Sequence, residues 1–164
     1  MKCIKCDSQL LLPIGEKHSP VLILGYAPTY DEYQKGVHGS FGSAVHVVLR
    51  QELAGAGMAF ESTRYTCMWG HLPNKQEADL EWNLKRALEE AKGRKAILLL
   101  GSELLRVFVP EHSKVLDVAG LKLSSHLLGK KLVMAAPHPS TVQHGNFGEL
   151  RFALEKFVKL ASKF

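Results

Sequence analysis

Two short apolar runs, each closed by a glycine, constrain the fold of this chain more than any other feature. The first is Val21-Leu22-Ile23-Leu24-Gly25 and the second is Ala96-Ile97-Leu98-Leu99-Leu100-Gly101. A continuous apolar run of this length, ended by a turn residue, is typical of a strand that is buried on both faces of a parallel sheet. Residues 64–69 are also β-prone, and we expect residues 131–136 to form a further strand.

Helical patterns alternate with these runs. Apolar side chains recur at helical spacing in residues 44–54, 76–91 and 148–163, which predicts three amphipathic helices. A shorter helix is expected directly after Gly101, with Ser102 as its cap. Strands that alternate with helices predict an α/β fold, here a three-layer α/β/α sandwich around a short central parallel sheet.

Length and composition limit the class of protein. The 164 residues, of which 46% are hydrophobic, predict one domain over residues 1–164, with residues 1–19 packed on it. The apolar runs are far too short to span a bilayer, and no signal-peptide pattern precedes them, so we expect a cytoplasmic protein with no membrane partner. Three cysteines cannot complete a disulfide framework, which agrees with a reducing compartment. The net charge of +5 is compatible with a polyanionic partner, although many unrelated proteins share it.

Ligands of such sheets bind beyond the carboxyl ends of the strands, which directs attention to the loops that follow the predicted strands. In one of them, Pro137-His138-Pro139-Ser140 carries a histidine between two prolines. Each proline fixes φ near −65°, so the imidazole is held on a stiff backbone. His138 is therefore a candidate catalytic group, and a structural or solvated histidine is the alternative.

Five segments, taken in chain order, match the motifs of one known family. They are Gly25-Tyr26-Ala27-Pro28 with the acids Asp31 and Glu32 behind it, Gly39-Ser40-Phe41-Gly42, Thr66-Cys67-Met68, Leu100-Gly101 and His138-Pro139-Ser140. In this order the chain resembles the uracil-DNA glycosylase superfamily, nearest to its families 4 and 5, over almost its whole length. The resemblance implies a monofunctional enzyme that flips a nucleotide out of DNA and hydrolyses its N-glycosidic bond.

The resemblance also implies roles for single residues around the base. His138 would donate a hydrogen bond, as a neutral imidazole, to the base carbonyl oxygen on which negative charge builds. Phe41 would stack on the extruded base, or would be an ordinary core aromatic. Tyr26 and Ala27 would line the base pocket.

Other residues would contact the DNA backbone and the gap left by the base. Ser102 and Ser140 would bind phosphates through their hydroxyls and backbone N–H groups. The segment His144-Gly145-Asn146-Phe147 would insert an apolar side chain, as a wedge, into the gap that the flipped base leaves in the DNA. Alternatively, Phe147 only fixes the last helix to the core.

Two positions depart from the family at the centre of the site. Tyr26 stands where the family has the glutamate or asparagine that positions the attacking water, and tyrosine is a poor base at neutral pH. We therefore nominate Asp31 and Glu32, in the same loop, to hold the water; the alternative is that both are solvated loop acids. Cys67 stands where the family reads uracil with an asparagine, and a thiol cannot reproduce the paired contacts of an amide.

These departures predict a redirected substrate pocket. The expected substrate is a modified pyrimidine, for example the glucosylated hydroxymethylcytosine of phage DNA, which would make the protein part of antiviral defence. A conventional uracil-DNA glycosylase of base-excision repair and a non-catalytic DNA-binding module are the alternatives. DNA is the expected partner, and neither a cofactor for the chemistry nor an obligate protein partner is expected.

A possible metal site begins at the N-terminus. Cys3-Ile4-Lys5-Cys6 matches the first pair of the four-cysteine iron–sulfur site of family 4, whose third and fourth positions fall near His71 and Asn83. A mixed site of Cys3, Cys6, His71 and a fourth group, for which His18 is conceivable, would suit structural zinc better than an iron–sulfur cluster. The alternative is a vestigial pair of thiols.

Overall fold

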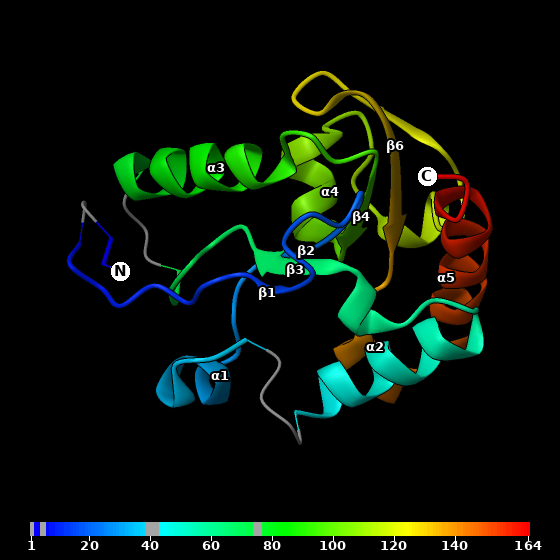
Figure 1. The fold of residues 1–164 in the computed structure, drawn as a ribbon, viewed down its shortest axis with the longest axis horizontal. Coiled ribbons are helices and arrows are strands. Elements are labelled where there is room, and N and C mark those ends of the chain that lie inside the picture. The colour runs from blue at the N-terminus through cyan, green and yellow to red at the C-terminus, as the bar shows by residue number, and fades with distance from the viewer. Residues whose placement is uncertain (1, 4–5, 39–42, 74–76) are drawn as a thin grey trace.

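A six-stranded sheet runs through the centre of the computed structural model, which describes residues 2–3, 6–38, 43–73 and 77–164 (Figure 1). Its order is β1-β3-β2-β4-β6-β5. The strands are β1 (Ile14–Gly15), β2 (Val21–Gly25), β3 (Arg64–Cys67), β4 (Ala96–Leu100), β5 (Leu123–Ser125) and β6 (Gly129–Ala136). The four inner strands are parallel, whereas β1 and β5 pair antiparallel at the two edges. The predicted central parallel sheet is therefore confirmed.

Helices cover both faces of this sheet. They are α1 (Tyr30–Lys35), α2 (Ala44–Gly55), α3 (Glu77–Ala91), α4 (Ser102–Phe108) and α5 (Phe147–Ala161), with the 3₁₀ turns η1 (Phe60–Ser62), η2 (Val115–Asp117) and η3 (Pro139–His144). Leu49 of α2 and Phe157 of α5 belong to the core on one face, and Ala87 of α3 and Phe108 of α4 belong to the core on the other. Figure 1 shows the helices in these two layers, which confirms the three-layer α/β/α sandwich.

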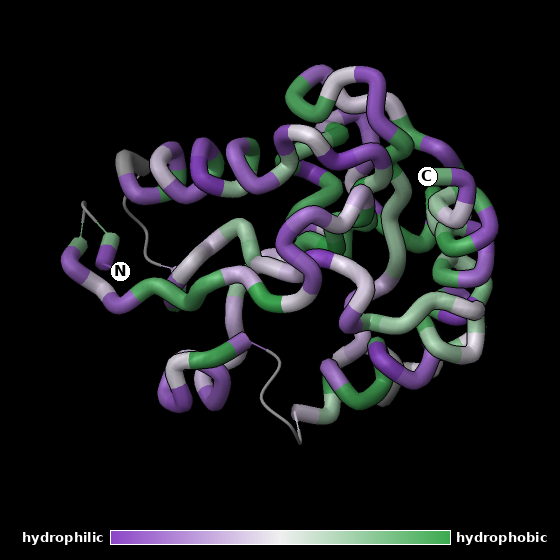
Figure 2. The backbone as a smooth tube through the Cα atoms, viewed as in Figure 1, coloured by the Kyte–Doolittle hydropathy of each residue, from purple (hydrophilic) through white to green (hydrophobic). Residues whose placement is uncertain are grey.

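The burial of the strands explains their sequences. Every residue of β2 and β4 is buried, because a strand between two helical layers meets apolar side chains on both faces. Ile23 packs in the core under α2 and α5, and Leu22 and Leu24 pack in the core under α3 and α4. The helices instead alternate hydrophilic and hydrophobic residues along their length, as Figure 2 shows for α2 and α5. None of the helices in the described part of the chain is long and apolar enough to cross a membrane.

One helix lies where a loop was expected. α1 follows β2 in the segment that was expected to be a loop, so Asp31 and Glu32 lie in the first turn of a helix. The helix begins with a capping box: the Thr29 hydroxyl accepts from the backbone N–H of Glu32, and the Glu32 carboxylate accepts from the backbone N–H of Thr29. Such a box satisfies two backbone donors that a short helix would otherwise leave unpaired.

The prediction that Ser102 caps α4 is also wrong. Gly101, and not Ser102, is the N-cap residue, and its φ of 95° lies in a region that favours glycine. Ser102 is the first residue of the helix, and its hydroxyl accepts a hydrogen bond from the backbone N–H of Val115 at 3.1 Å. This bond ties the start of α4 to η2.

Candidate active site

The loops that follow β2, β3, β4 and β6 meet at one edge of the sheet. Gly25 pairs with Cys67 at the ends of β2 and β3, and Leu100 pairs with Ala136 at the ends of β4 and β6. Backbone hydrogen bonds continue past the strands: Met68 N–H donates to the Gly25 carbonyl at 2.8 Å, and Gly101 N–H donates to the Ala136 carbonyl at 2.9 Å. The loops singled out from the sequence therefore start side by side, as expected for parallel strands.

His138 stands just beyond the end of β6 and is half-buried. Its Nδ1 accepts a hydrogen bond from the backbone N–H of Ser140 at 3.2 Å and lies 2.7 Å from the Ser140 hydroxyl. Because a backbone N–H can only donate, Nδ1 carries no proton, and the proton of the neutral ring is on Nε2. Burial lowers the pKa of His138, and nearby Glu103 partly opposes this shift. The side chain is thus a neutral imidazole with a donor at Nε2.

Gly101 packs closely against this histidine. A Cβ atom at Gly101 would lie 3.5 Å from Cβ of His138 and 3.4 Å from a carboxylate oxygen of Glu103. Both the close approach and the positive φ therefore suit a glycine at the end of β4. The Leu-Gly ending of this strand lets the loops of β4 and β6 lie against each other.

A buried acid–histidine pair lies near His138. Oε1 of Glu32 lies 2.6 Å from Nε2 of His46, and each side chain is only 2% exposed. A carboxylate oxygen accepts, so Nε2 of His46 is the donor. Nδ1 of His46 is buried and has no hydrogen-bond partner within the described residues. The helix α2 that carries His46 packs against η3, which follows His138, and both members of the pair influence the pKa of His138.

The two acids nominated from the sequence are therefore separated by the structure. Glu32 is buried and bonded to Thr29 and His46. Asp31 is exposed and forms an ion pair with Lys35 at 2.8 Å. Only Glu32 belongs to the buried cluster next to the loop edge.

His46 was not among the residues nominated from the sequence. The signal was present, because His46, Leu49 and Leu53 are the buried residues of α2 and follow the i, i+3, i+7 spacing of one helix face. A histidine on the apolar face of a helix is a buried polar group that needs a partner. The sequence did not indicate that this partner would be Glu32 of α1.

Cys67 lies at the end of β3 and is completely buried. Its Sγ is 3.6 Å from the hydroxyl of Tyr65 and 3.9 Å from Nδ1 of His38. Burial raises the pKa of Cys67 to about 12 and lowers the pKa of His38 to about 4, so both groups are neutral at pH 7. A Cβ at Gly25 would lie only 3.0 Å from this sulfur. A glycine at position 25 therefore lets the Cys67 side chain pack against the end of β2.

Three other residues were nominated for base contact. Two of them lie on the face of the sheet opposite to Cys67, and the third lies outside the described residues. Tyr26 and Ala27 are half-buried and pack against the core under α3 and α4, whereas Cys67 belongs to the core under α2 and α5. Phe41 lies outside the residues that the structure describes. Its expected stacking role stays a prediction.

The residues nominated for DNA contact lie on three elements, with Ser102 at the start of α4, Ser140 in η3, and Asn146 and Phe147 at the start of α5. Ser140 is exposed, and Asn146 and Phe147, at the start of α5, are half-buried. The guanidinium of Arg151 lies 4.6 Å from the ring centre of Phe147, and Phe147 belongs to neither core cluster. An arginine therefore covers one face of its ring, and both the wedge and the attachment of the helix to the core stay predictions. The side chain of His144 lies outside the described part.

The cysteine pair at the N-terminus does meet His71. One ligand atom from each of Cys3, Cys6, His71 and Asp79 lies within 4.8 Å of the others. The fourth member is Asp79 of α3, and the described atoms do not include His18 in this group. Asn83, which also follows in α3, hydrogen-bonds to both His71 and Asp79.

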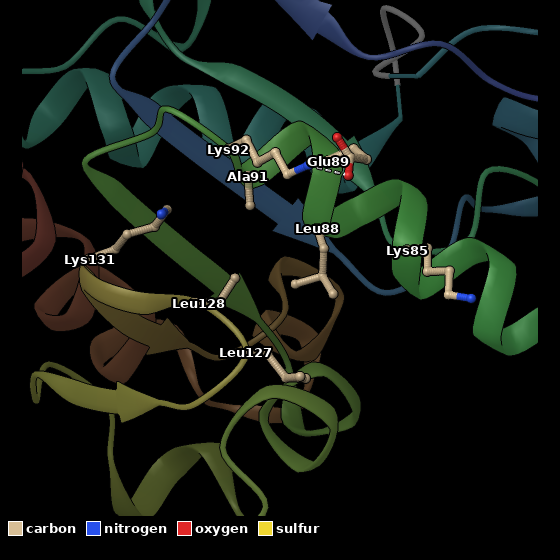
Figure 3. A pocket seen from close by; sticks show the side chains of 8 residues that line it. All are labelled: Lys85, Leu88, Glu89, Ala91, Lys92, Leu127, Leu128 and Lys131. Carbon is tan, nitrogen blue, oxygen red and sulfur yellow. Dashed lines mark hydrogen bonds and ion pairs between the residues drawn. The ribbon is translucent and has the colours of Figure 1, made fainter.

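The hollow drawn in Figure 3 is a different feature. It lies between α3 and the β5–β6 turn, where Leu88 faces Leu127 and Leu128 and Lys131 stands at the rim. Lys131 is near the amino end of β6, seven residues before His138, or about 20 Å along an extended strand. This hollow is therefore remote from the loop edge that carries His138.

Comparisons with known proteins agree with the arrangement of the loops. The family model described as "Uracil DNA glycosylase superfamily" matches residues 12–161, which include β1 to β6 and the loop with His138. Among curated proteins, no match to the chain was found.

Proposed function

This chain belongs to the uracil DNA glycosylase superfamily, and from that membership, which indicates a hydrolase acting on DNA, we propose that it is a monofunctional DNA glycosylase. It would flip a base out of the helix, because the bond between C1′ and the base nitrogen is inaccessible inside a duplex. The observation that carries the proposal is the neutral His138, with its donor on Nε2 and its backbone stiffened by two prolines. A cytoplasmic location is part of the proposal.

His138 would act on the departing base. As the N-glycosidic bond breaks, the bonding electrons pass to the base and negative charge builds on its carbonyl oxygen. A fixed N–H donor stabilises this charge more in the transition state than in the ground state. Because burial keeps His138 neutral, the group donates a hydrogen bond without first having to gain a proton.

His46 and Glu32 would position the water in place of the acid that Tyr26 has replaced. Nδ1 of His46 can accept a proton from a water whose oxygen bonds to C1′, and Glu32 would hold the ring through Nε2. Two observations support this choice over Asp31: the pair is buried next to η3, and Asp31 is exposed and paired with Lys35. His46 would be the catalytic residue, and Glu32 a positioning residue.

The base would be a modified pyrimidine and not uracil. The support is chemical: Cys67 is a buried neutral thiol, and a thiol cannot supply the paired donor and acceptor with which an amide reads uracil. Glucosylated hydroxymethylcytosine of phage DNA is the proposed substrate, with antiviral defence as the role. Ser102, Ser140, Asn146 and Phe147 are the proposed contacts to the DNA.

Base release from a set of oligonucleotides tests the proposal. The duplexes carry uracil, hypoxanthine, hydroxymethylcytosine or glucosylated hydroxymethylcytosine at one position, and abasic sites are detected by alkaline cleavage. We expect the fastest release from the glucosylated base, with no strand cleavage before alkali. Release of uracil alone would favour a repair enzyme, and binding without release of any base would favour a non-catalytic DNA-binding module.

A further inference from the structure

The N-terminal segment, the loop after β3 and the start of α3 meet in a cluster of metal-ligating side chains. Figure 1 shows the N-terminal segment and the first turns of α3 on the same side of the molecule. Cys3 and Cys6 come from the segment, His71 from the loop and Asp79 from the helix. Cys3, His71 and Asp79 are at most 2% exposed, and Cys6 is half-buried.

The distances in the cluster agree with one tetrahedral ion. Typical zinc bonds to sulfur, nitrogen and oxygen place neighbouring ligand atoms about 3.3–3.8 Å apart in a tetrahedron. Sγ of Cys6 lies 3.6 Å from Nε2 of His71, which lies 3.4 Å from Oδ1 of Asp79. Sγ of Cys3 lies 3.1 Å from the same carboxylate oxygen. These three distances lie within about 0.2 Å of the tetrahedral range, and no two of the four ligand atoms are more than 4.8 Å apart.

The surroundings prepare His71 to bind through Nε2. Its Nδ1 donates to the backbone carbonyl of Leu72 at 2.7 Å, because a carbonyl oxygen can only accept. In the neutral ring this leaves a lone pair on Nε2, which faces the two cysteines and Asp79. A metal-bound histidine usually donates its second ring N–H to such a carbonyl.

Asn83 braces Asp79 and the ligand loop from the next turn of α3. Its amide nitrogen donates to Oδ1 of Asp79 at 3.2 Å and to the Asp79 backbone carbonyl at 2.9 Å, and the ion would replace its 3.3 Å contact with Nε2 of His71. Its amide oxygen accepts from the backbone N–H of Gly70 at 2.9 Å. The buried amide thus fixes the ligand loop to the helix without being a ligand itself.

The donor set does not fit the iron–sulfur cluster that the resemblance to family 4 implies. Such clusters are held by four cysteine thiolates, and this chain has only three cysteines. The third, Cys67, lies in β3 beside Tyr65 and His38. Two thiolates, an imidazole and a carboxylate are instead a set that zinc accepts in a closed, four-ligand structural site.

We propose that Cys3, Cys6, His71 and Asp79 bind one structural Zn²⁺. The ion joins the N-terminal segment to α3 and to the loop that begins at the end of β3. The proposal does not depend on the glycosylase activity, because it is argued from the four ligand side chains and is tested by metal content and stability.

Metal content of the parent protein is the first test. The untagged chain is passed over a chelating resin to remove loosely bound metal and is then analysed for zinc, iron and acid-labile sulfide. We expect one zinc per chain and neither iron nor sulfide. Iron with sulfide, or a folded protein with no metal, would overturn the proposal.

Matched variants test the ligands. Cys3→Ser and Asp79→Asn keep the side-chain shapes and should lose most of the zinc. Cys67→Ser changes a thiol in the same way outside the cluster and should keep one zinc per chain, as should His18→Asn. Asn83→Leu should weaken zinc binding by about 10–100-fold in competition with a chelator. Equal zinc content in all these proteins would overturn the ligand assignment.

A third test removes the metal from the parent protein and so does not depend on whether the variants fold. A strong chelator should lower the melting temperature, and added Zn²⁺, but not Mg²⁺, should restore it. Co²⁺ added to the stripped protein should give the visible absorption of a tetrahedral thiolate site. An unchanged melting temperature after complete zinc removal would overturn the structural role.

Discussion

Nε2 of His46 donates to the carboxylate of Glu32 across 2.6 Å, in a place where both side chains are almost completely buried. Glu32 also accepts from the backbone and hydroxyl of Thr29, so it caps α1 while it orients an imidazole of α2. A buried carboxylate is stable only when such partners satisfy it. The other ring nitrogen of His46 has no hydrogen-bond partner within the described residues, which is the basis for its proposed role toward water.

Changing either member of this pair should slow base release. His46→Gln keeps an N–H that can donate to Glu32 but cannot accept a proton from water, so the single-turnover rate should fall by roughly 10²–10⁴. Glu32→Gln keeps the capping box, which glutamine also forms, and should give a smaller loss.

The control for these variants is Glu111→Gln, which removes an exposed carboxylate outside the pair. It should leave the rate unchanged. Asp31→Asn compares the second nominated acid directly. A larger rate loss in Asp31→Asn than in Glu32→Gln would contradict the assignment of the pair.

His38 should make the protein less stable in acid. Burial lowers its pKa from 6.5 to about 4, so below pH 6.5 the unfolded chain binds a proton that the folded chain excludes. The free energy of unfolding therefore decreases as the pH falls through this window, by about 2–3 kcal/mol between pH 7 and 4.5 from this residue alone. Urea unfolding at the two pH values should show a smaller difference for His38→Gln than for the parent.

The exposed His126 provides the matched control for this comparison. His126→Gln should leave the difference between the two pH values as it is in the parent. If His38→Gln also retained the full difference, His38 would not be the buried neutral histidine that the structure describes.

Cys67→Asn should shift the choice of base toward uracil. The new amide can pair with the donor and acceptor edge of uracil, and each polar match in a desolvated pocket is worth about 1–3 kcal/mol. Activity on uracil should rise relative to the parent, and activity on the larger natural base should fall. Tyr26 packs against the core on the other face of the sheet, so adding Tyr26→Glu should change the activity on uracil independently of Cys67→Asn.

Cys67→Ala removes the thiol without adding an amide and should gain no activity on uracil. The alternative is that Cys67 packs against Tyr65 and Gly25 and has no part in base recognition. In that case Cys67→Asn would lower the melting temperature and leave the ratio of the two activities unchanged, which would refute the specificity argument.

Binding to DNA without a substrate base should depend steeply on salt. Contacts to phosphates release counterions, and three contacts would weaken binding about 40-fold between 50 and 200 mM salt. Fluorescence anisotropy with a labelled duplex measures this, with sucrose at equal osmolality as the control. An affinity that salt does not change would speak against a DNA-binding groove.

The inner part of the fold could be predicted because its sequence pattern is direct. β2 and β4 are buried on both faces, so their residues are continuously apolar. The edge strands β1 and β5 have two and three residues, too few to show a period of two. α1 has six residues in a stretch rich in turn formers, and only its Thr-x-x-Glu capping box indicated a helix.

The candidate site was harder to predict because its members meet only in the folded chain. His138 was recognisable from its two prolines and its place after a strand. The contact of Glu32 with His46 depends on the approach of α1 to α2, and the fourth metal-site residue, Asp79, depends on the approach of α3 to the N-terminal segment. Neither approach leaves a local pattern in the sequence.

The most direct test of the account is single-turnover base release by His138→Ala. The variant lacks the neutral donor at the departing base, so the rate on the glucosylated substrate should fall by roughly 10²–10³ while the affinity for DNA stays nearly the same. Ser140→Ala keeps the backbone N–H that fixes the ring and should lose less, and His126→Ala should lose nothing. Base release at the parental rate in His138→Ala would contradict the central claim.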